Sequence, residues 1–272
     1  MAETFFEPDG EFYRATELTR GPWDPGAQHA GPPAALIGRE LERLGEGRIG
    51  GEGGAPAQVG RVTYEVLRSV PIAPLRVSAE VLRPGRRVEM VGAVLTDAGG
   101  EPLMRAQGWR IRTEAVDFDA PPDPPSPPAG PDAGAPGEFF PTGHDAGYHT
   151  AMDYRFVSGA FMEPGPAVVW MRMGVPLVPG EEPSPLQRVL VAADSGNGVS
   201  AALDWRRYLF INVDLTVHLN RMPEGEWVCL DAVTLPERNG VGISDTALFD
   251  QAGPIGRAAQ TLLVGERSAA QD

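Results

Sequence analysis

Two polar side chains in the second half of the chain have the types and settings that acid–base chemistry requires. Asp194 ends the apolar stretch PLQRVLVAAD, and Gln260 lies in the stretch PIGRAAQTLLV. If the first stretch is a helix, the negative end of its dipole makes the Asp194 carboxylate a better proton acceptor. Gln260 would lie in a row of small or apolar residues, where a buried amide needs partners. The simpler alternatives are a solvated turn at Asp194 and a purely structural amide at Gln260.

The stretch INVDLTVHL alternates between apolar and polar residues and predicts a strand with two different faces. The predicted apolar face holds Ile211, Val213, Leu215, Val217 and Leu219, and the predicted polar face holds Asn212, Asp214, Thr216 and His218. Such a polar face is typical of the solvated side of an antiparallel sheet. It becomes a candidate site only if other polar groups lie against it.

Other nucleophiles find little support in the sequence. The single cysteine, Cys229, alternates with apolar residues in a predicted strand, which indicates packing. The chain has no GxSxG motif, and none of its four histidines stands in a triad-like context. His29 precedes the first predicted helix, where it would either line a substrate channel or serve the turn. Without a CxxC motif or a His/Cys cluster, we expect no metal and no cofactor.

The elements that must position these residues are predicted twice. A first apolar helix is predicted in AALIGRELERL after Gly31, and a second in PLQRVLVAAD, with Ser184 as N-cap, Gln187 as capping-box partner and the glycines from Gly196 as the stop. Strands are expected to follow each helix. The predicted strands are 61–70, 75–83, 87–100 and 102–112 in the first half, and 210–220, 226–235, 242–250 and 254–264 in the second.

A shift of 152 residues aligns the two halves at several positions, such as Pro33 with Pro185 and Arg105 with Arg257. We therefore predict a degenerate duplication. The predicted fold class is α+β, a double hotdog, in which two tandem units each wrap an antiparallel sheet around a central helix. A segment rich in proline, residues 117–138, would link an N-terminal unit at 1–116 to a C-terminal unit at 139–272.

Composition limits the classes of partner. All 23 basic residues are arginine, and with 37 acidic residues the net charge is −14, so we expect no nucleic acid and no anionic membrane surface. The N-terminal stretch MAETFFEPDG lacks the features of a secretion signal, and no apolar run approaches the length of a membrane span. The expectation is a cytoplasmic protein.

Taken together, these stretches resemble one family, the TesB-like acyl-CoA thioesterases of the acyl-CoA thioesterase II type. The resemblance covers nearly the whole chain. In the first half it rests on HAGPPAALIGREL and MRAQGWRIR, and in the second on AADSGNG, DLTVHLNRMPEGEW and the strand containing RAAQ. It implies a hydrolase that cleaves the thioester of fatty acyl-CoA to free fatty acid and CoA.

The resemblance also implies roles for individual residues. In the family, a carboxylate after the second central helix, a hydroxyl residue on the next strand and a glutamine on the final strand hold the attacking water. The carboxylate falls on Asp194 and the glutamine on Gln260. The hydroxyl position falls on Asn212, which has no hydroxyl, so Thr216, four residues further along the same predicted face, is the alternative. The substrate-binding candidates are His29, Gly31, Arg68 and Arg221.

Two other functions stay open on the sequence. Hotdog hydratases use an Asp–His pair near the central helix, and the second predicted helix of this chain contains no histidine. A catalytically weak or silent acyl-CoA- or lipid-binding protein would keep the fold, and the asparagine at position 212 favours that alternative. For the enzyme we expect acyl-CoA as the substrate and a homodimer as the assembly.

Overall fold

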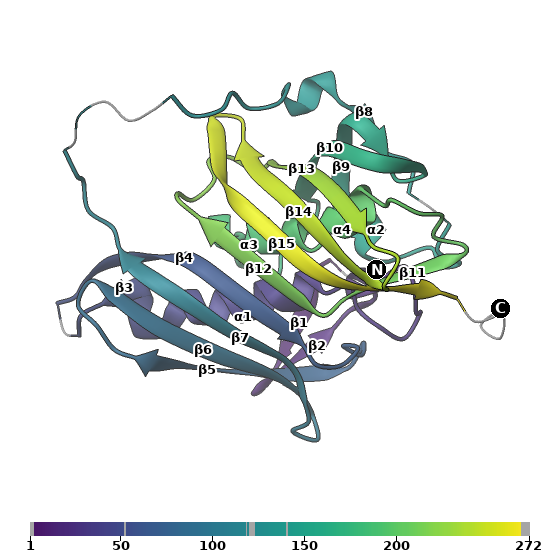
Figure 1. The fold of residues 1–272 in the computed structure, drawn as a ribbon. Helices are drawn as coiled ribbons and strands as arrows, with labels where there is room; N and C mark the ends of the chain where they lie inside the picture. The colour runs from purple at the N-terminus through teal and green to yellow at the C-terminus, as the bar shows by residue number, and fades with distance from the viewer. Residues whose placement is uncertain (1–2, 52, 118, 120–122, 140, 268–272) are drawn as a thin grey trace.

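The computed structural model describes residues 3–51, 53–117, 119, 123–139 and 141–267. Strands dominate it, and they form one continuous antiparallel sheet that curls around the helices (Figure 1). Most buried apolar side chains of both halves belong to one core cluster, which includes Leu36 and Ile37 of the first half and Leu190 and Val191 of the second.

The first half consists of a long helix and the strands around it. The elements are β1 (Phe6–Asp9), β2 (Phe12–Ala15), α1 (Gly31–Arg43), β3 (Arg48–Ile49), β4 (Ala55–Val66), β5 (Pro74–Arg83), β6 (Val88–Asp97) and β7 (Pro102–Arg112), with 3-10 turns at Glu17–Thr19 and Leu44–Gly47. The predicted helix and the four strands after it are present. The hairpin β1–β2 precedes the helix and was not predicted.

The second half repeats this order. The elements are a 3-10 turn at Pro131–Ala133, β8 (Ala135–Pro136), α2 (Tyr148–Ala151), β9 (Met152–Ala160), β10 (Glu163–Met173), α3 (Pro185–Ala193), α4 (Gly196–Val199), β11 (Tyr208–Asn212), β12 (Asp214–Leu219), β13 (Val228–Pro236), β14 (Val241–Asp250) and β15 (Gly253–Glu266). The hairpin β9–β10 was not predicted, because its second strand begins with the sequence Glu-Pro-Gly-Pro, which is typical of a turn.

The two halves join edge to edge through β4 and β12. The strand order is β1-β2-β5-β6-β7-β4-β12-β15-β14-β13-β10-β9-β8, with β11 also paired to β15 and β3 to β4. At the junction, Val62 lies opposite Val217 and Thr63 opposite Thr216. The junction therefore extends one sheet across both halves, which confirms the predicted double hotdog.

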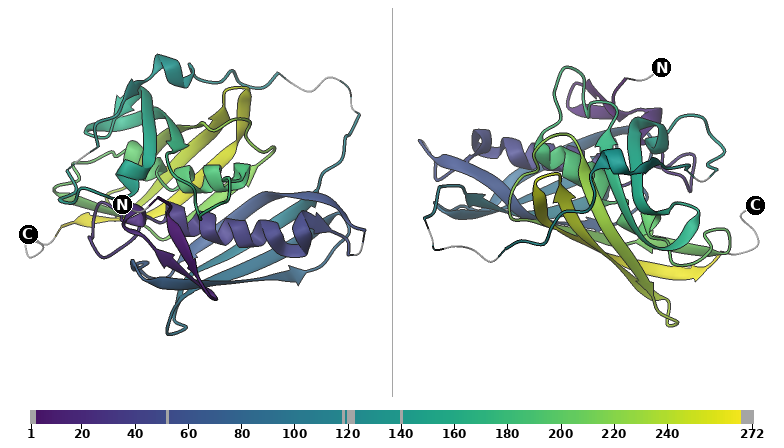
Figure 2. Two further views of the ribbon diagram at one scale, coloured as in Figure 1. Left: turned by 180° about the vertical axis from the view of Figure 1, so that it is seen from behind. Right: turned by 90° about the horizontal axis from the view of Figure 1, so that it is seen from above.

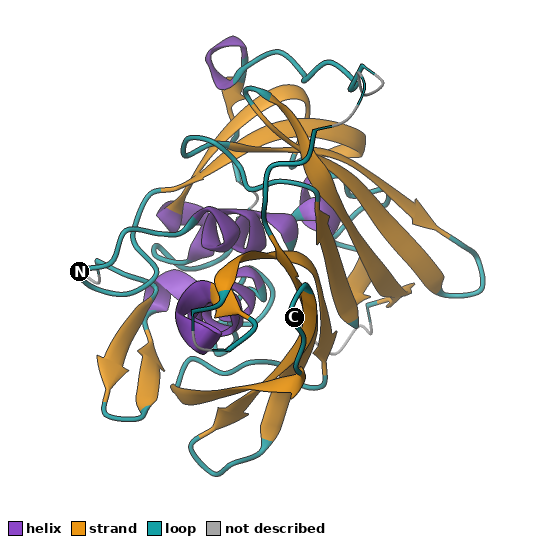
Figure 3. Ribbon diagram, turned by 90° about the vertical axis from the view of Figure 1, so that its left-hand side faces the viewer, coloured by secondary structure: helices purple, strands orange, loops and turns teal. Residues whose placement is uncertain are grey.

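The central helices α1 and α3 lie against each other inside the curl of the sheet (Figures 2 and 3). They run antiparallel, because Gly31 at the start of α1 approaches Val191 near the end of α3, and Glu42 near the end of α1 accepts from the hydroxyl of Ser184, the N-cap of α3. A Cβ atom on Gly31 would lie 2.4 Å from the carbonyl oxygen of Val191, so only glycine permits this distance. The N-terminus of each helix consequently lies beside the C-terminal end of the other.

The duplication is visible in the elements themselves. A shift of 152 residues carries α1 onto α3, β5 onto β13, β6 onto β14 and β7 onto β15, each to within two residues at its ends. The N-cap of α3 is as predicted, with the Ser184 hydroxyl accepting from the Gln187 N–H at 3.2 Å. The glycines from Gly196 were predicted to stop the helix, but after a break at Asp194 they form the short helix α4.

An irregularity divides the strand that contains the predicted polar face. Asn212 pairs with Leu262, whereas Thr216 pairs with Ala259, so β11 and β12 contain one residue more than β15 does over this stretch. Such a β-bulge reverses the alternation of side chains beyond it. Ile211 and Val213 are half exposed, while Leu215 is buried against the helices. The predicted continuous apolar and polar faces are therefore wrong on one side of the bulge.

The segment between the halves adds one strand to the second. Residues 118 and 120–122 of the predicted linker lie outside the described residues. Further along, β8 pairs with β9, and the carbonyl of Ala129 accepts from the Trp170 indole N–H at 2.7 Å. The domain boundaries at 116 and 139 stay a prediction.

Candidate active site

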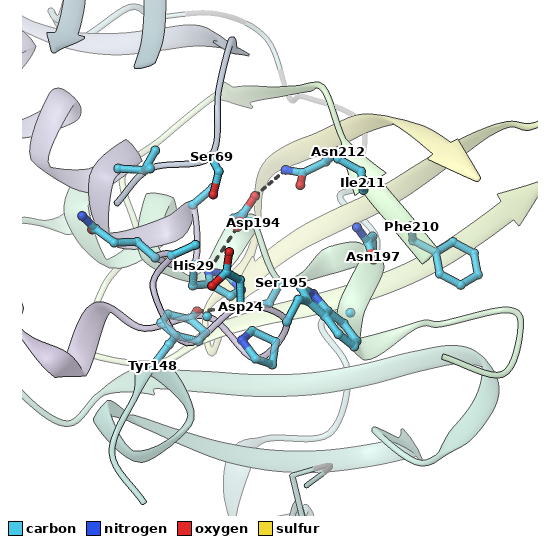
Figure 4. Close-up of a pocket in the computed structure, with 18 of the residues that line it drawn as sticks. Asp24, His29, Ser69, Tyr148, Asp194, Ser195, Asn197, Phe210, Ile211 and Asn212 are labelled. Carbon is cyan, nitrogen blue, oxygen red and sulfur yellow. Dashed lines mark hydrogen bonds and ion pairs between the residues drawn. The ribbon is translucent and has the colours of Figure 1, made fainter. Parts of the chain in front are cut away.

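Asp194 lies where the two central helices meet. It caps the C-terminal end of α3, beside the loop that leads into α1, and its residue exposure is 7%. Figure 4 shows its carboxylate at the centre of the polar side chains around the pocket. A buried carboxylate needs hydrogen-bond donors, and the surrounding chain supplies several of them.

Two amides donate to one carboxylate oxygen. The Asn212 Nδ2 group on β11 donates to Asp194 Oδ1 at 2.8 Å, and the Gln260 Nε2 group on β15 donates to the same oxygen at 3.2 Å. Gln260 Nε2 also lies 3.2 Å from the Asp194 carbonyl oxygen, and its Oε1 accepts from the Asn197 N–H at 3.1 Å. The buried Gln260 side chain therefore connects the end of α3 to the start of α4.

His29 approaches the other carboxylate oxygen. Its Nδ1 lies 3.1 Å from Asp194 Oδ2, and the same nitrogen lies 3.1 Å from the N–H of Gly31. The imidazole stacks on the Tyr148 ring with centroids 3.8 Å apart and planes inclined by 8°. Burial lowers the pKa of His29 below its ordinary value of 6.5, and the Asp194 carboxylate partly opposes that shift. His29 is consequently neutral at neutral pH.

Tyr148 and Ser195 hold the other side of the imidazole in place. The Tyr148 hydroxyl donates to the Val191 carbonyl at 2.7 Å and lies 3.0 Å from Ser195 Oγ. Because the phenol has one proton, Ser195 must be the donor in the second contact. Burial also raises the pKa of Tyr148, so the phenol stays neutral. Ser195 is thus engaged as a donor and lacks a base that would make it a nucleophile.

A pocket of about 320 Å³ opens beside this cluster. Asp194, His29 and Asn212 line it at one side. The remaining lining is largely apolar and includes Val66, Val70, Phe139, Tyr154 and Phe161. Three of these rings pack edge to face, Phe139 against Phe161 at 4.6 Å and Tyr154 against Phe161 at 5.0 Å between centroids. The arrangement suits an apolar group whose reacting end meets the polar side.

The structure brings Asn212 to Asp194 but not Thr216. The Thr216 hydroxyl donates to Thr63 Oγ1 at 3.1 Å across the junction of β12 and β4, and Thr216 is not among the residues that line the pocket. The sequence pattern put Asn212 and Thr216 on one face. The β-bulge between them turns Thr216 to the outer face of the sheet, and this could not be read from the alternation.

The substrate-binding candidates take different places. His29 and Arg68 line the pocket, and Arg68 forms an exposed ion pair with Glu101 at 2.6 Å. Gly31 begins α1 and packs on the Val191 carbonyl, and it contributes its N–H group beside His29. Sequence reasoning left His29 open between lining a channel and serving the turn, and it missed the contact with Asp194, since the two residues belong to different halves.

Arg221 lies away from the pocket lining, in the loop before β13. Its guanidinium makes two contacts of 2.5 Å with the Asp250 carboxylate and donates to the Gly253 carbonyl at 3.1 Å. Asp250 is fully buried at the turn between β14 and β15, where it also accepts from backbone N–H groups. The guanidinium of Arg221 therefore stabilises this turn and does not reach the pocket.

The structure supports neither a cysteine nucleophile nor a metal site. Cys229 is fully buried and its thiol pKa is raised by burial, so it is a packing residue. Across the residues that the structure describes, no group of three or more His, Cys, Asp or Glu side chains could hold a metal ion. None of the helices in that same part of the chain is both long enough and apolar enough to cross a membrane.

The molecule is thus a double hotdog with a buried carboxylate at the meeting point of its central helices and an apolar pocket beside it, and family models show the class of enzymes to which it belongs. Two such models match, one for each half of the chain. Residues 19–111 match the acyl-CoA thioesterase N-terminal domain, and residues 118–264 match the acyl-CoA thioesterase C-terminal domain. The chain belongs to the TesB-like acyl-CoA thioesterases and is a thioester hydrolase.

Solved structures share this fold over nearly their whole length. A protein assigned as a thioesterase II from Thermobifida fusca is 18% identical, with 97% of this chain and 96% of that chain covered and a TM-score of 0.72. A hot dog protein of unknown function from Alicyclobacillus acidocaldarius is 16% identical, with the same coverage and a TM-score of 0.69. The acyl-CoA thioesterase II TesB2 from Mycobacterium marinum is 15% identical, with 98% and 96% covered and a TM-score of 0.62. No curated protein sequence matches the chain.

Proposed function

We propose that this protein hydrolyses fatty acyl-CoA to free fatty acid and CoA, with a water molecule activated at an acid–base centre that is built on Asp194 and held in place by Gln260 and Asn212. The observation that carries the proposal is the convergence of Asn212, Gln260 and His29 on one buried carboxylate beside an apolar pocket. A carboxylate held by several donors in a dry site is fixed in place, as the centre of an acid–base site must be.

The reaction needs no covalent intermediate on the protein. Water gives up a proton to the acid–base centre at Asp194 as its oxygen attacks the thioester carbonyl carbon. The tetrahedral intermediate then collapses with cleavage of the C–S bond, and the departing CoA sulfur takes up a proton.

The apolar part of the pocket supports a fatty acyl group as the substrate portion. Its aromatic side chains would cover the chain, and the polar side would receive the thioester. At the pocket wall, Arg68 is the arginine we assign to a CoA phosphate. Its partner Glu101 is exposed, and an exposed ion pair contributes only about 0–1 kcal/mol, so a phosphate can replace that carboxylate.

Arg221 is not assigned to CoA in this proposal. Removing its guanidinium from the buried Asp250 carboxylate would leave an unpaired buried charge, which costs roughly 3–5 kcal/mol.

The predicted homodimer is part of the proposal. The outer sheet face supports it, because Ile211, Leu263 and Val241 lie side by side across three strands and are each half exposed. Cytoplasmic location is proposed on the sequence alone.

The test measures the hydrolysis of a series of acyl-CoA esters of increasing chain length, with release of the CoA thiol as the readout. We expect turnover by the natural sequence and a loss of at least about 100-fold in kcat for Asp194→Asn, the scale of an acid–base contribution. Asp214→Asn is the matched control, because that carboxylate accepts from Thr261 on the outer side of the bulge. It should keep its activity.

Two results would count against the proposal. Binding of acyl-CoA without turnover would identify a silent carrier, the alternative function that the asparagine at 212 suggested. Turnover that survives Asp194→Asn would move the acid–base centre elsewhere in the molecule.

A further inference from the structure

The hydrogen bonds at Asp194 leave little of its carboxylate for a water molecule. Oδ1 already accepts from the Asn212 and Gln260 amides, and Oδ2 lies 3.1 Å from His29 Nδ1. The carboxylate is almost completely buried. His29 lines the pocket as Asp194 does, but the described residues offer no hydrogen-bond partner to its Nε2 atom. The group beside the apolar pocket that has a free basic atom is therefore the imidazole.

The position of the proton on His29 follows from its neighbours. Only one of the two contacts at Nδ1 can be a hydrogen bond at a time, because a protonated Nδ1 donates and an unprotonated one accepts. An unprotonated Nδ1 would put its lone pair against a carboxylate oxygen at 3.1 Å. Asp194 Oδ1 already accepts from two amides, and a hydrogen bond from Nδ1–H to Oδ2 would satisfy the other oxygen, which favours the tautomer with the proton on Nδ1. In that tautomer Nε2 is an acceptor.

The imidazole is also held rigidly. The Tyr148 ring stacks on it at 3.8 Å, and that ring is anchored through its hydroxyl to the Val191 carbonyl and to Ser195. Gly31 begins α1 directly beside it. A general base must be fixed within hydrogen-bond reach of the proton it takes, and this packing provides such a fixed position.

We propose that His29 and Asp194 form a catalytic dyad in which the Nε2 atom of His29 takes the proton from the attacking water, while Asp194 orients the imidazole and stabilises its protonated form. This inference rests on the proposed thioester hydrolysis and assigns its base. As the water oxygen bonds to the carbonyl carbon, its proton moves to Nε2 and the imidazolium is stabilised by Asp194. When the C–S bond breaks, the Nε2 proton moves to the CoA sulfur, which restores neutral His29.

The dyad predicts a particular pH dependence. His29 must be neutral to act, so activity should fall as the pH falls through its pKa, which burial places below 6.5. The groups that face the imidazole are the Asp194 carboxylate, the Tyr148 phenol, which stays neutral, and the uncharged Gly31 amide. The acid limb of kcat/KM should therefore report one group below pH 6.5.

The deciding variant is His29→Asn, whose amide nitrogen can replace Nδ1 as the donor to Asp194 while Nε2 is lost. We expect kcat to fall by at least about 100-fold with KM little changed, and we expect added imidazole to restore part of the activity of His29→Ala. His218→Asn is the matched control, because His218 lies exposed on the outer face of β12. Its kcat should equal that of the natural sequence.

Other outcomes overturn the dyad or separate it from the proposed function. If His29→Asn keeps its kcat within about tenfold while Asp194→Asn is inactive, Asp194 itself is the base. A loss confined to KM would make His29 a binding residue and would also overturn the dyad. If the natural sequence hydrolyses no acyl-CoA, the proposed function fails. Nitrogen NMR of His29 in the natural protein then still decides, since a proton on Nε2 rather than Nδ1 contradicts the dyad.

Discussion

Asp194 is surrounded by donors that come from β11, β15 and the loop before α1. Residue types and positions in the sequence were sufficient to select Asp194 and Gln260 as candidates, because a carboxylate at a helix end and an amide in an apolar row are both unusual. They were not sufficient to find the contact between His29 and Asp194. That contact depends on how closely the two helices pack, which local sequence patterns do not encode.

At the residue scale, we predict that Gln260→Ala lowers kcat by about 10- to 100-fold and changes KM less, because the amide holds the Asp194 carboxylate and does not anchor CoA. Steady-state kinetics on one acyl-CoA checks this. Gln187→Ala is the matched control, since Gln187 is a similarly buried amide that bonds the Glu42 carboxylate at the other end of α3. Equal loss of turnover and of binding in Gln260→Ala would contradict the prediction.

At the scale of elements, the antiparallel packing of α1 on α3 and the bulge between β11 and β12 build the site. The two helices and the eight strands after them were predictable from periodicity and from the capping residues. The bulge was not, because the stretch INVDLTVHL alternates without interruption and only its pairing with β15 shows the extra residue. For this reason the sequence left Asn212 and Thr216 as equal alternatives.

The closeness of the two helices leads to a prediction for Gly31→Ala. Its new Cβ atom would meet the Val191 carbonyl oxygen at 2.4 Å and push the start of α1, with His29, away from Asp194. We expect kcat to fall by roughly tenfold or more, and unfolding free energy to fall by about 1–3 kcal/mol. Kinetics and chemical denaturation measure both. In the control Gly265→Ala, the Cβ atom meets Leu209 at an ordinary 3.6 Å, and both quantities should be unchanged.

For the molecule as a whole, the two halves differ at the positions that matter for chemistry. The shift of 152 residues carries Asp194 onto Glu42, but it carries Gln260 onto Gly108 and Asn212 onto Gly60. Glu42 accepts from the Ser184 hydroxyl at 2.6 Å and so holds the start of α3. The predicted duplication was sufficient to derive the overall architecture. It did not show that the helix end at Asp194 forms a candidate site while the equivalent end at Glu42 forms a structural contact, because both depend on how the halves pack together.

The proposed homodimer can be tested on the outer sheet face. Leu263 lies beside Ile211 and Val241, and all three are half exposed. We expect Leu263→Glu to convert a dimer into a monomer, because burying its charge there would be costly. Light scattering coupled to size exclusion gives the mass. Ile111→Glu is the matched control at the counterpart position of the first half, which is similarly exposed, and it should leave the mass unchanged. A monomeric natural protein would refute the homodimer.

The continuous sheet through β4 and β12 has a consequence for how this molecule could change over time. In an assembly of two identical units, every substitution occurs at both equivalent positions at once. Here both units belong to one polypeptide, so position 108 can be glycine while its counterpart at 260 is glutamine. Covalent linkage thus frees each unit from the symmetry of the other. One pair of helix ends can specialise in stability while the other specialises in reactivity, a division of labour that identical subunits cannot reach.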